Sequence, residues 1–154
     1  MITVAKNIIN KARTESVKLY LPSDVICGSS IDDPNPQGPF MIQDIPNDMM
    51  GLDIGPETTA KFNSILGQSR TVVWNGPMGV FETDGYDSGT RDMGIHLANC
   101  TANDIKVIVG GGDTAAALEK FGLIKDMTHV STGGGASLEL LSGNQLPALR
   151  VLEK

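Results

Sequence analysis

Two glycine triplets are the residues in this chain best suited to chemistry. In the first, GGGDT at residues 110–114, the β-branched run VIV leads directly into three glycines and then into a predicted helix. Glycine lets a ligand approach the backbone closely, and the first-turn N–H groups of the helix would point at that ligand. Asp113 could hold a Mg²⁺ ion that accompanies a phosphate, and Thr114 could donate to a phosphate oxygen. The alternative is a tight turn in which Asp113 or Thr114 only caps the helix.

The second triplet repeats the same arrangement in HVSTGGGASL, residues 129–138. In a doubly wound sheet, two such loops at the carboxyl ends of parallel strands can open into one crevice. Two helix N-termini directed at one point would create a local positive potential in a chain of net charge −6. This combination favours a group with several negative charges, such as a polyphosphate in transfer.

A third loop follows the predicted strand in TVVWNGPMGVFE, residues 71–82. Asn75 stands at the strand end, where its amide could bond a phosphate or ribose oxygen. Glu82 has the chemistry to accept hydrogen bonds from ribose hydroxyls. The alternative places Trp74, Val80 and Phe81 in the core and leaves Glu82 exposed to solvent.

The elements that must position these loops alternate regularly from residue 51 onward. Such alternation, with short connections, predicts a parallel, doubly wound α/β sheet. The predicted strands are residues 70–74, 104–109 and 128–130, and the predicted helices are residues 56–66, 86–100, 114–121 and 136–141.

The pattern before residue 51 is less regular. Apolar residues at helical spacing predict a helix over residues 2–14. Residues 18–21 (KLYL) are typical of a short buried strand. Segments 24–28 and 40–44 could form a small hairpin-like appendage around a polar loop at residues 29–39.

Composition and charge exclude several classes of function. The net charge of −6 argues against a basic face for nucleic acid, and no apolar run approaches the roughly 20 residues that span a bilayer. Lys6 interrupts the N-terminus before any long apolar run, so no signal peptide is expected. Cys27 and Cys100 lack metal-site spacing and are expected to be reduced thiols. His96 and His129 have no catalytic partner in motif context and are interpreted as structural.

Four stretches together resemble the phosphoglycerate kinase family. They occur in the family's order and at its spacing, the longer ones are highly specific, and the resemblance runs from about Leu21 onward. The matching stretches are GLDIGP (51–56), VWNGPMGVFE (73–82), GGGDT (110–114) and HVSTGGGASLELL (129–141).

The resemblance implies an ATP- or ADP-binding site with Mg²⁺, and it assigns residues to each end of the nucleotide. Gly51 and Leu52 would line the adenine end, with Pro77 and Val80 nearby. Glu82 would hold the ribose hydroxyls.

At the other end of the nucleotide, Asn75 would approach the phosphates and Asp113 would bind the metal. The residues implied to hold the phosphate tail are Gly111, Gly112, Asp113 and Thr114. The residues implied to act in catalysis, through N–H groups directed at the phosphoryl group in flight, are Gly133, Gly134 and Gly135.

The implied reaction is phosphoryl transfer between 1,3-bisphosphoglycerate and ADP, which gives 3-phosphoglycerate and ATP in glycolysis. Family members are typically monomeric, and their two halves bind one substrate each and close by a hinge. The implied compartment is the cytoplasm, with a plastid not excluded, and neither nucleic acid nor membrane is expected as a partner.

Complete members of the family are much longer than this chain. Residues 1–154 are therefore expected to be a single partial nucleotide-binding domain, without the N-terminal domain that binds 3-phosphoglycerate and supplies a catalytic arginine. In the family, a Gly-Gly-x-Lys segment in the early part of the nucleotide domain supplies lysines that bind phosphate, and this segment is also missing here. None of the twelve Lys and Arg residues lies in the three glycine loops. The isolated chain is expected to be inactive and to carry an unpaired sheet edge and uncovered apolar surface. The alternatives are a stand-alone adenine nucleotide-binding module without catalysis and a structural protein whose pocket is empty.

Overall fold

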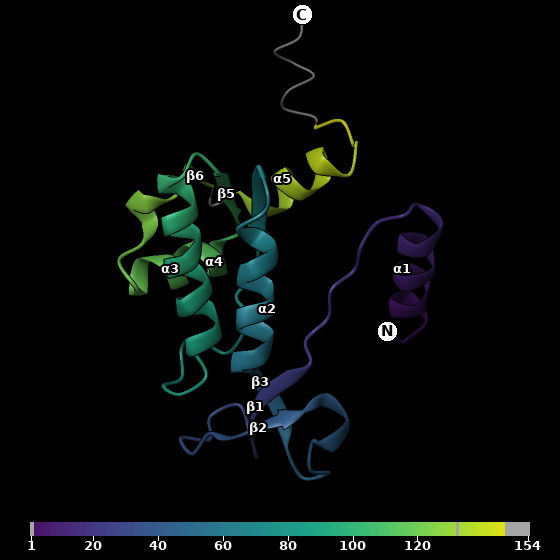
Figure 1. The fold of residues 1–154 in the computed structure, drawn as a ribbon, viewed down its shortest axis with the longest axis vertical. Helices are drawn as coiled ribbons and strands as arrows, with labels where there is room; N and C mark the ends of the chain where they lie inside the picture. Colours follow the sequence, from purple (N-terminus) through teal and green to yellow (C-terminus); the bar gives the residue numbers. More distant parts are fainter. Residues whose placement is uncertain (1, 132, 147–154) are drawn as a thin grey trace, which may run out of the picture.

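The computed structural model describes residues 2–131 and 133–146. Within these residues the chain forms two three-stranded sheets and five α-helices (Figure 1). The strands are β1 (Asp24–Gly28), β2 (Gln37–Met41), β3 (Met50–Ile54), β4 (Thr71–Asn75), β5 (Lys106–Gly110) and β6 (His129–Ser131). The α-helices are α1 (Ile2–Thr14), α2 (Pro56–Leu66), α3 (Ser88–Ala102), α4 (Gly112–Lys120) and α5 (Gly134–Leu141), with 3₁₀ turns at Ile42–Asp44 and Ile124–Asp126.

Strands β4, β5 and β6 form a parallel sheet in that order, which confirms the predicted α/β architecture. Alternate side chains of β4 and β5, such as Trp74 and Val109, are buried on one face beneath α2, α3 and α4. The other face is flanked by α5, so that helices lie on both sides of the sheet, as in a doubly wound fold. On this second face Val73 and Ile108 remain 47% and 37% exposed, in agreement with the expected uncovered apolar surface.

The main hydrophobic core lies between the parallel sheet and the three helices on its first face. Apolar side chains at helical spacing on α2 and α3 meet the inward side chains of the strands. The buried members of this core are Ile54, Val72, Trp74, Met93, Leu97, Val107, Val109, Leu118 and Met127. The carboxyl ends of β4, β5 and β6 are thereby fixed relative to one another.

The predicted hairpin is confirmed, with its second strand at Gln37–Met41 instead of residues 40–44, and it is extended by a third strand; residues 42–44 form a 3₁₀ turn. β1 pairs antiparallel with β2 on one side and with β3 on the other. β3 is not expected from the sequence, because it carries Gly51 and Asp53 and is short of β-branched residues.

Asp24 connects this antiparallel sheet to helix α2. The N-cap residue of α2 is Gly55, which has no side chain to satisfy the first-turn N–H groups. The Asp24 carboxylate takes that role: it accepts hydrogen bonds from Glu57 N at 3.0 Å, Thr58 N at 2.7 Å and the Thr58 hydroxyl at 2.6 Å. Burial raises the pKa of Asp24, but these hydrogen bonds outweigh it and leave the pKa below its ordinary value.

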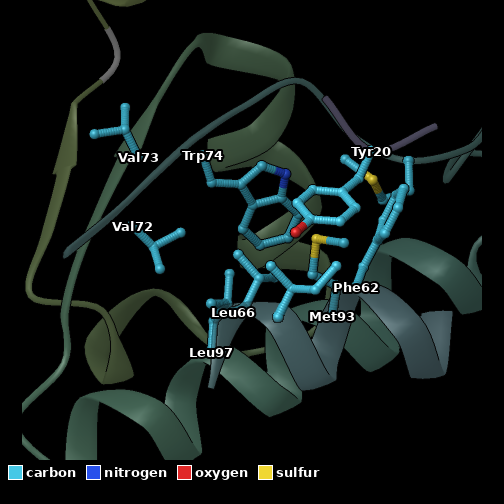
Figure 2. Close-up of a pocket in the computed structure, with 10 residues that line it drawn as sticks. Tyr20, Phe62, Leu66, Val72, Val73, Trp74, Met93 and Leu97 are labelled. Carbon is cyan, nitrogen blue, oxygen red and sulfur yellow. The ribbon is translucent and has the colours of Figure 1, made fainter. Parts of the chain in front are cut away.

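The prediction of a buried strand at residues 18–21 is wrong. The segment is extended but belongs to neither sheet, and Leu19 and Tyr20 are 45% and 42% exposed. A short apolar run shows only that a segment could pair, and β4, the outer strand of the parallel sheet, pairs in the described residues with β5 alone. Tyr20 instead lines a cavity of about 260 Å³ between β4, α2 and α3, together with Trp74 and Phe62 (Figure 2).

Helix α1 confirms the prediction for residues 2–14, but it lies apart from the sheets (Figure 1) and contains no buried residue. No helix in the described part of the chain combines the length and apolar character needed to cross a membrane.

Candidate nucleotide-binding site

The three loops singled out in the sequence leave the parallel sheet side by side. Asn75, the last residue of β4, is in register with Gly110 at the end of β5, and Gly110 is in register with Ser131 at the end of β6. Parallel strands place all three carboxyl ends at one edge, where ligands of open α/β sheets bind. The structure therefore brings the loops together as predicted.

The two glycine turns touch each other. Gly111 N donates to Ser131 O at 3.2 Å. A Cβ atom placed on Gly134 would lie 2.5 Å from Gly111 Cα and 3.4 Å from Asn75 Nδ2. One placed on Gly111 would lie 3.2 Å from the same amide nitrogen. Only residues without a side chain allow this approach, and the Asn75 amide lies against both turns.

Both helices begin at these turns without a capping side chain. The N-cap of α4 is Gly111, whose φ of 99° lies in the region that favours glycine, and the N-cap of α5 is Gly133. Asp113 and Thr114 are therefore not N-caps, and the capping role that the alternative gave them is wrong. The first-turn N–H groups of two adjacent helices remain available to a ligand, with the positive ends of two helix dipoles behind them.

Asp113 and Thr114 point in different directions from the first turn of α4. Asp113 is exposed, whereas Thr114 is fully buried. The Thr114 hydroxyl accepts a hydrogen bond from Gly76 N at 2.8 Å and donates to Gly110 O at 3.1 Å. Its proton is used within the protein, so in this structure Thr114 holds the loop after β4 against the turn after β5.

The loop after β4 extends from the phosphate end of the candidate site to the antiparallel sheet. Val80 N donates to Leu52 O at 2.8 Å, which brings together two of the residues expected at the adenine end. Leu52 is buried, Gly51 is exposed, and Pro77 and Val80 are half-buried. Glu82 is exposed, as the alternative interpretation of this loop also expects.

Trp74 and Phe81 are buried, in agreement with the core role that the alternative gave them. Trp74 also donates from Nε1 to Gly76 O at 2.7 Å. The indole therefore fixes the first turn of the loop as well as filling the core.

Two buried polar residues near this loop were not predicted from the sequence. The Thr90 hydroxyl, at the start of α3, accepts hydrogen bonds from Met78 N at 2.9 Å and Gly79 N at 3.3 Å. The Asp53 carboxylate is 3% exposed and accepts from Ile54 N at 2.8 Å and Gly89 N at 2.7 Å. The sequence signal available for Asp53 was an acidic residue within an otherwise apolar strand.

Burial raises the pKa of Asp53 to about 6, against the opposing effect of its two backbone hydrogen bonds. The nearby charges of Asp87 and Asp92 act in the same direction as burial. Asp53 is therefore a buried carboxyl group that connects β3 to the N-terminus of α3.

Asp113 is the one residue expected to ligate a metal. The described residues contain no group of three or more His, Cys, Asp or Glu side chains that could hold a metal ion. A single carboxylate fits Mg²⁺, which takes many of its ligands from water and phosphate oxygens. The two cysteines are free and buried, and His96 Nε2 lies 3.4 Å from Cys100 Sγ within α3.

A cavity of about 190 Å³ lies beside the three loops, between the second face of the sheet and α5. Asn75 and Gly110 line its polar end, and Leu138 and Ile108 contribute apolar side chains. Asn75 therefore both lines this cavity and lies against the two glycine turns.

The comparisons with known proteins agree with this geometry. The family model "Phosphoglycerate kinase" matches residues 1–144. The chain is 48% identical over 152 residues to phosphoglycerate kinase of Chlorobium chlorochromatii and 47% identical over 154 residues to that of a Nitratiruptor species. These alignments cover 98% and 99% of the chain, but the chain spans only 38% of the length of either relative.

Solved structures show the same relationship. Phosphoglycerate kinase from Coxiella burnetii superimposes with a TM-score of 0.88 at 40% identity, over 97% of this chain and 38% of that protein. The enzyme from Pyrococcus horikoshii gives a TM-score of 0.75 at 28% identity, over 98% of this chain and 38% of the other. The chain belongs to the phosphoglycerate kinase family.

Proposed function

We propose that this chain supplies the MgATP/MgADP site for the phosphoglycerate kinase reaction, as a single partial nucleotide-binding domain over residues 1–154. The reaction is phosphoryl transfer between 1,3-bisphosphoglycerate and ADP, which gives 3-phosphoglycerate and ATP in glycolysis. The observation that carries the proposal is the meeting of two uncapped helix N-termini and the Asn75 amide at one edge of the parallel sheet.

The phosphate end of the nucleotide would lie over the two glycine turns. The N–H group of Gly112 would donate to the phosphate tail, and those of Gly134 and Gly135 to the phosphoryl group in transfer. Gly111 and Gly133 would shape the two turns, because their own N–H groups already donate to Ser131 O and Ser131 Oγ. These donors are fixed by the fold before the reaction begins, so they need little reorganisation when negative charge develops. Mg²⁺, when bound, would neutralise part of the phosphate charge, and Asp113 would hold it.

The nucleoside would extend along the loop after β4 toward the antiparallel sheet. Pro77, Val80, Gly51 and Leu52 offer backbone and apolar surface for adenine, and the exposed carboxylate of Glu82 is free to accept from ribose hydroxyls. Thr114 would serve the phosphate tail indirectly, because its hydroxyl already bonds within the protein.

The isolated chain would bind nucleotide without turnover. Its three loops contain no lysine or arginine, and cations that neutralise the transferred phosphoryl group contribute large factors to such reactions. Because the relatives are much longer, 3-phosphoglycerate would bind to a part of the family's fold outside these 154 residues. The proposed glycolytic role would be carried out in the cytoplasm.

Calorimetric titration with ADP, with and without Mg²⁺, tests the proposal. Wild-type chain should give saturable binding of MgADP. Asp113→Asn should raise the Kd for MgADP about tenfold, equivalent to about 1.4 kcal/mol, and should bind metal-free ADP no more weakly than wild type. Asp126→Asn removes the same charge from an exposed residue beyond the end of α4 and serves as the matched control.

The absence of saturable MgADP binding by the folded wild-type chain would contradict the proposal. Equal affinities of Asp113→Asn and Asp126→Asn for MgADP would contradict only the metal role of Asp113 and would leave the nucleotide site itself intact.

A further inference from the structure

Lys120, the last residue of α4, is bonded to the loop that carries Val80 and Glu82. Its Nζ donates to Phe81 O at 2.6 Å and lies 3.6 Å from Asp87 Oδ2 and 3.8 Å from Asp84 Oδ1. The ammonium group thus bonds both the start and the end of the segment 81–87.

These contacts differ in strength. Asp84 is fully exposed, so its ion pair contributes little. The Asp87 side chain is only 13% exposed and that of Lys120 is 36% exposed, so solvent screens this pair less. Phe81 is 7% exposed, and the loss of a charged donor to the carbonyl of a buried residue is costly. The contacts with Phe81 and Asp87 therefore hold the segment.

Helix α4 consequently connects the two ends of the candidate site. Its first residues, Gly112 and Asp113, belong to the phosphate turn, and its last residue holds the backbone directly before Glu82. Nine helical residues span about 13 Å at 1.5 Å per residue, and the helix packs in the core through Leu118. The distance between the phosphate turn and the Glu82 loop is therefore set by a rigid element.

We propose that Lys120 is a positioning residue, which fixes the Glu82 loop relative to the phosphate turn and so sets the affinity for the nucleoside part of the ligand. This inference rests on the proposed nucleotide site. It predicts that Lys120 matters for a ligand that reaches the loop and not for one that occupies the phosphate turn alone.

The test compares Lys120→Met with wild type, using MgADP and magnesium pyrophosphate as probes. Lys120→Met keeps an unbranched apolar side chain and removes Nζ. It should raise the Kd for MgADP about tenfold and leave the Kd for pyrophosphate within about twofold. Lys120→Arg, which retains a charged donor, should recover most of the affinity for MgADP. Lys125→Met makes the same change at an exposed residue after α4 and should match wild type.

Amide hydrogen exchange without any ligand provides an independent readout. Exchange in peptides over residues 79–87 should rise about tenfold in Lys120→Met and remain at the wild-type level in Lys125→Met. If Lys120→Met leaves both the exchange and the affinity for MgADP unchanged, the inference is overturned. It is also overturned if Lys120→Met raises the Kd values for MgADP and for pyrophosphate by the same factor. If wild type binds neither probe, the proposed function and the ligand part of the inference both fail, and exchange still decides whether Lys120 holds the loop.

Discussion

Replacement of Asp53 by Asn should change how the stability of the chain depends on pH. The Asp53 carboxyl is buried, and within the described residues it accepts hydrogen bonds from two backbone N–H groups, those of Ile54 and Gly89. Burial is the largest cause of its raised pKa, and the charges of Asp87 and Asp92 add to it. Asn has nearly the same shape but does not ionise, so the substitution removes the titration from this position.

The magnitude follows from the pKa of Asp53, which rises from 3.8 to about 6 on folding. Each pKa unit corresponds to about 1.36 kcal/mol, so the shift is equivalent to about 3 kcal/mol. Because the folded-state pKa is the higher one, the contribution of Asp53 to stability is greatest below about pH 4. It falls as the pH rises from about 4 to about 6 and is constant above that range.

Urea unfolding measures this effect directly. Trp74 is the single tryptophan and is 4% exposed in the core, so its fluorescence reports the loss of packing. The free energy of unfolding of wild type minus that of Asp53→Asn should fall by about 2.5 kcal/mol between about pH 4 and pH 7, most of the full shift. Subtracting the free energy of unfolding of Asp53→Asn cancels the contributions of the other titrating groups, including Asp24, because both proteins contain them. A difference that stays constant within about 0.5 kcal/mol over this range would refute the reasoning, whatever the absolute stability of the variant.

Two further substitutions test the other contacts that shape the fold and the site. Asp24→Ala leaves the first turn of α2 and the Thr58 hydroxyl without their acceptor and should lower the free energy of unfolding at pH 7 by about 2 kcal/mol. Since the pKa of Asp24 is lowered on folding, this loss should shrink as the pH falls below about 4, and a pH-independent loss would contradict a carboxylate cap. Gly134→Ala places a methyl group against Gly111 and should lower both the melting temperature and the affinity for MgADP. Gly135→Ala places its methyl group where no protein atom lies within 4 Å and should leave the melting temperature unchanged; equal melting temperatures of the two variants would show that the turns are not in contact.

The sequence predicted the parallel sheet and the loops at its edge because both depend on local signals. The runs before Asn75 and Gly110 are rich in β-branched residues, and glycine triplets directly followed by helices mark two of the strand ends. These features also predicted that the two triplets would lie side by side, since parallel strands share one carboxyl edge.

The parts that could not be predicted depend on partners far away in the sequence. Residues 18–21 have the composition of a strand, but no strand in the described residues pairs with them. β3 forms because its residues pair with β1, where Ile54 lies opposite Val25, and its own composition gives little indication of a strand.

Supporting residues of the site were missed for the same reason. Asp53 bonds a backbone group 36 residues away, and Lys120 bonds one 39 residues away. Neither contact produces a period or a motif in the sequence. The inward orientation of Thr114 is likewise set by Gly76, which belongs to a different loop.

We expect a single polyphosphate to be bound at once by the loops after β4, β5 and β6. Titration of the isotope-labelled chain with MgADP, followed by backbone amide chemical shifts, tests this directly. The amides of residues 75–76, 110–114 and 133–136 should shift together along curves that fit one Kd. Shifts confined to one of these loops, or found instead in the antiparallel sheet, would contradict the account.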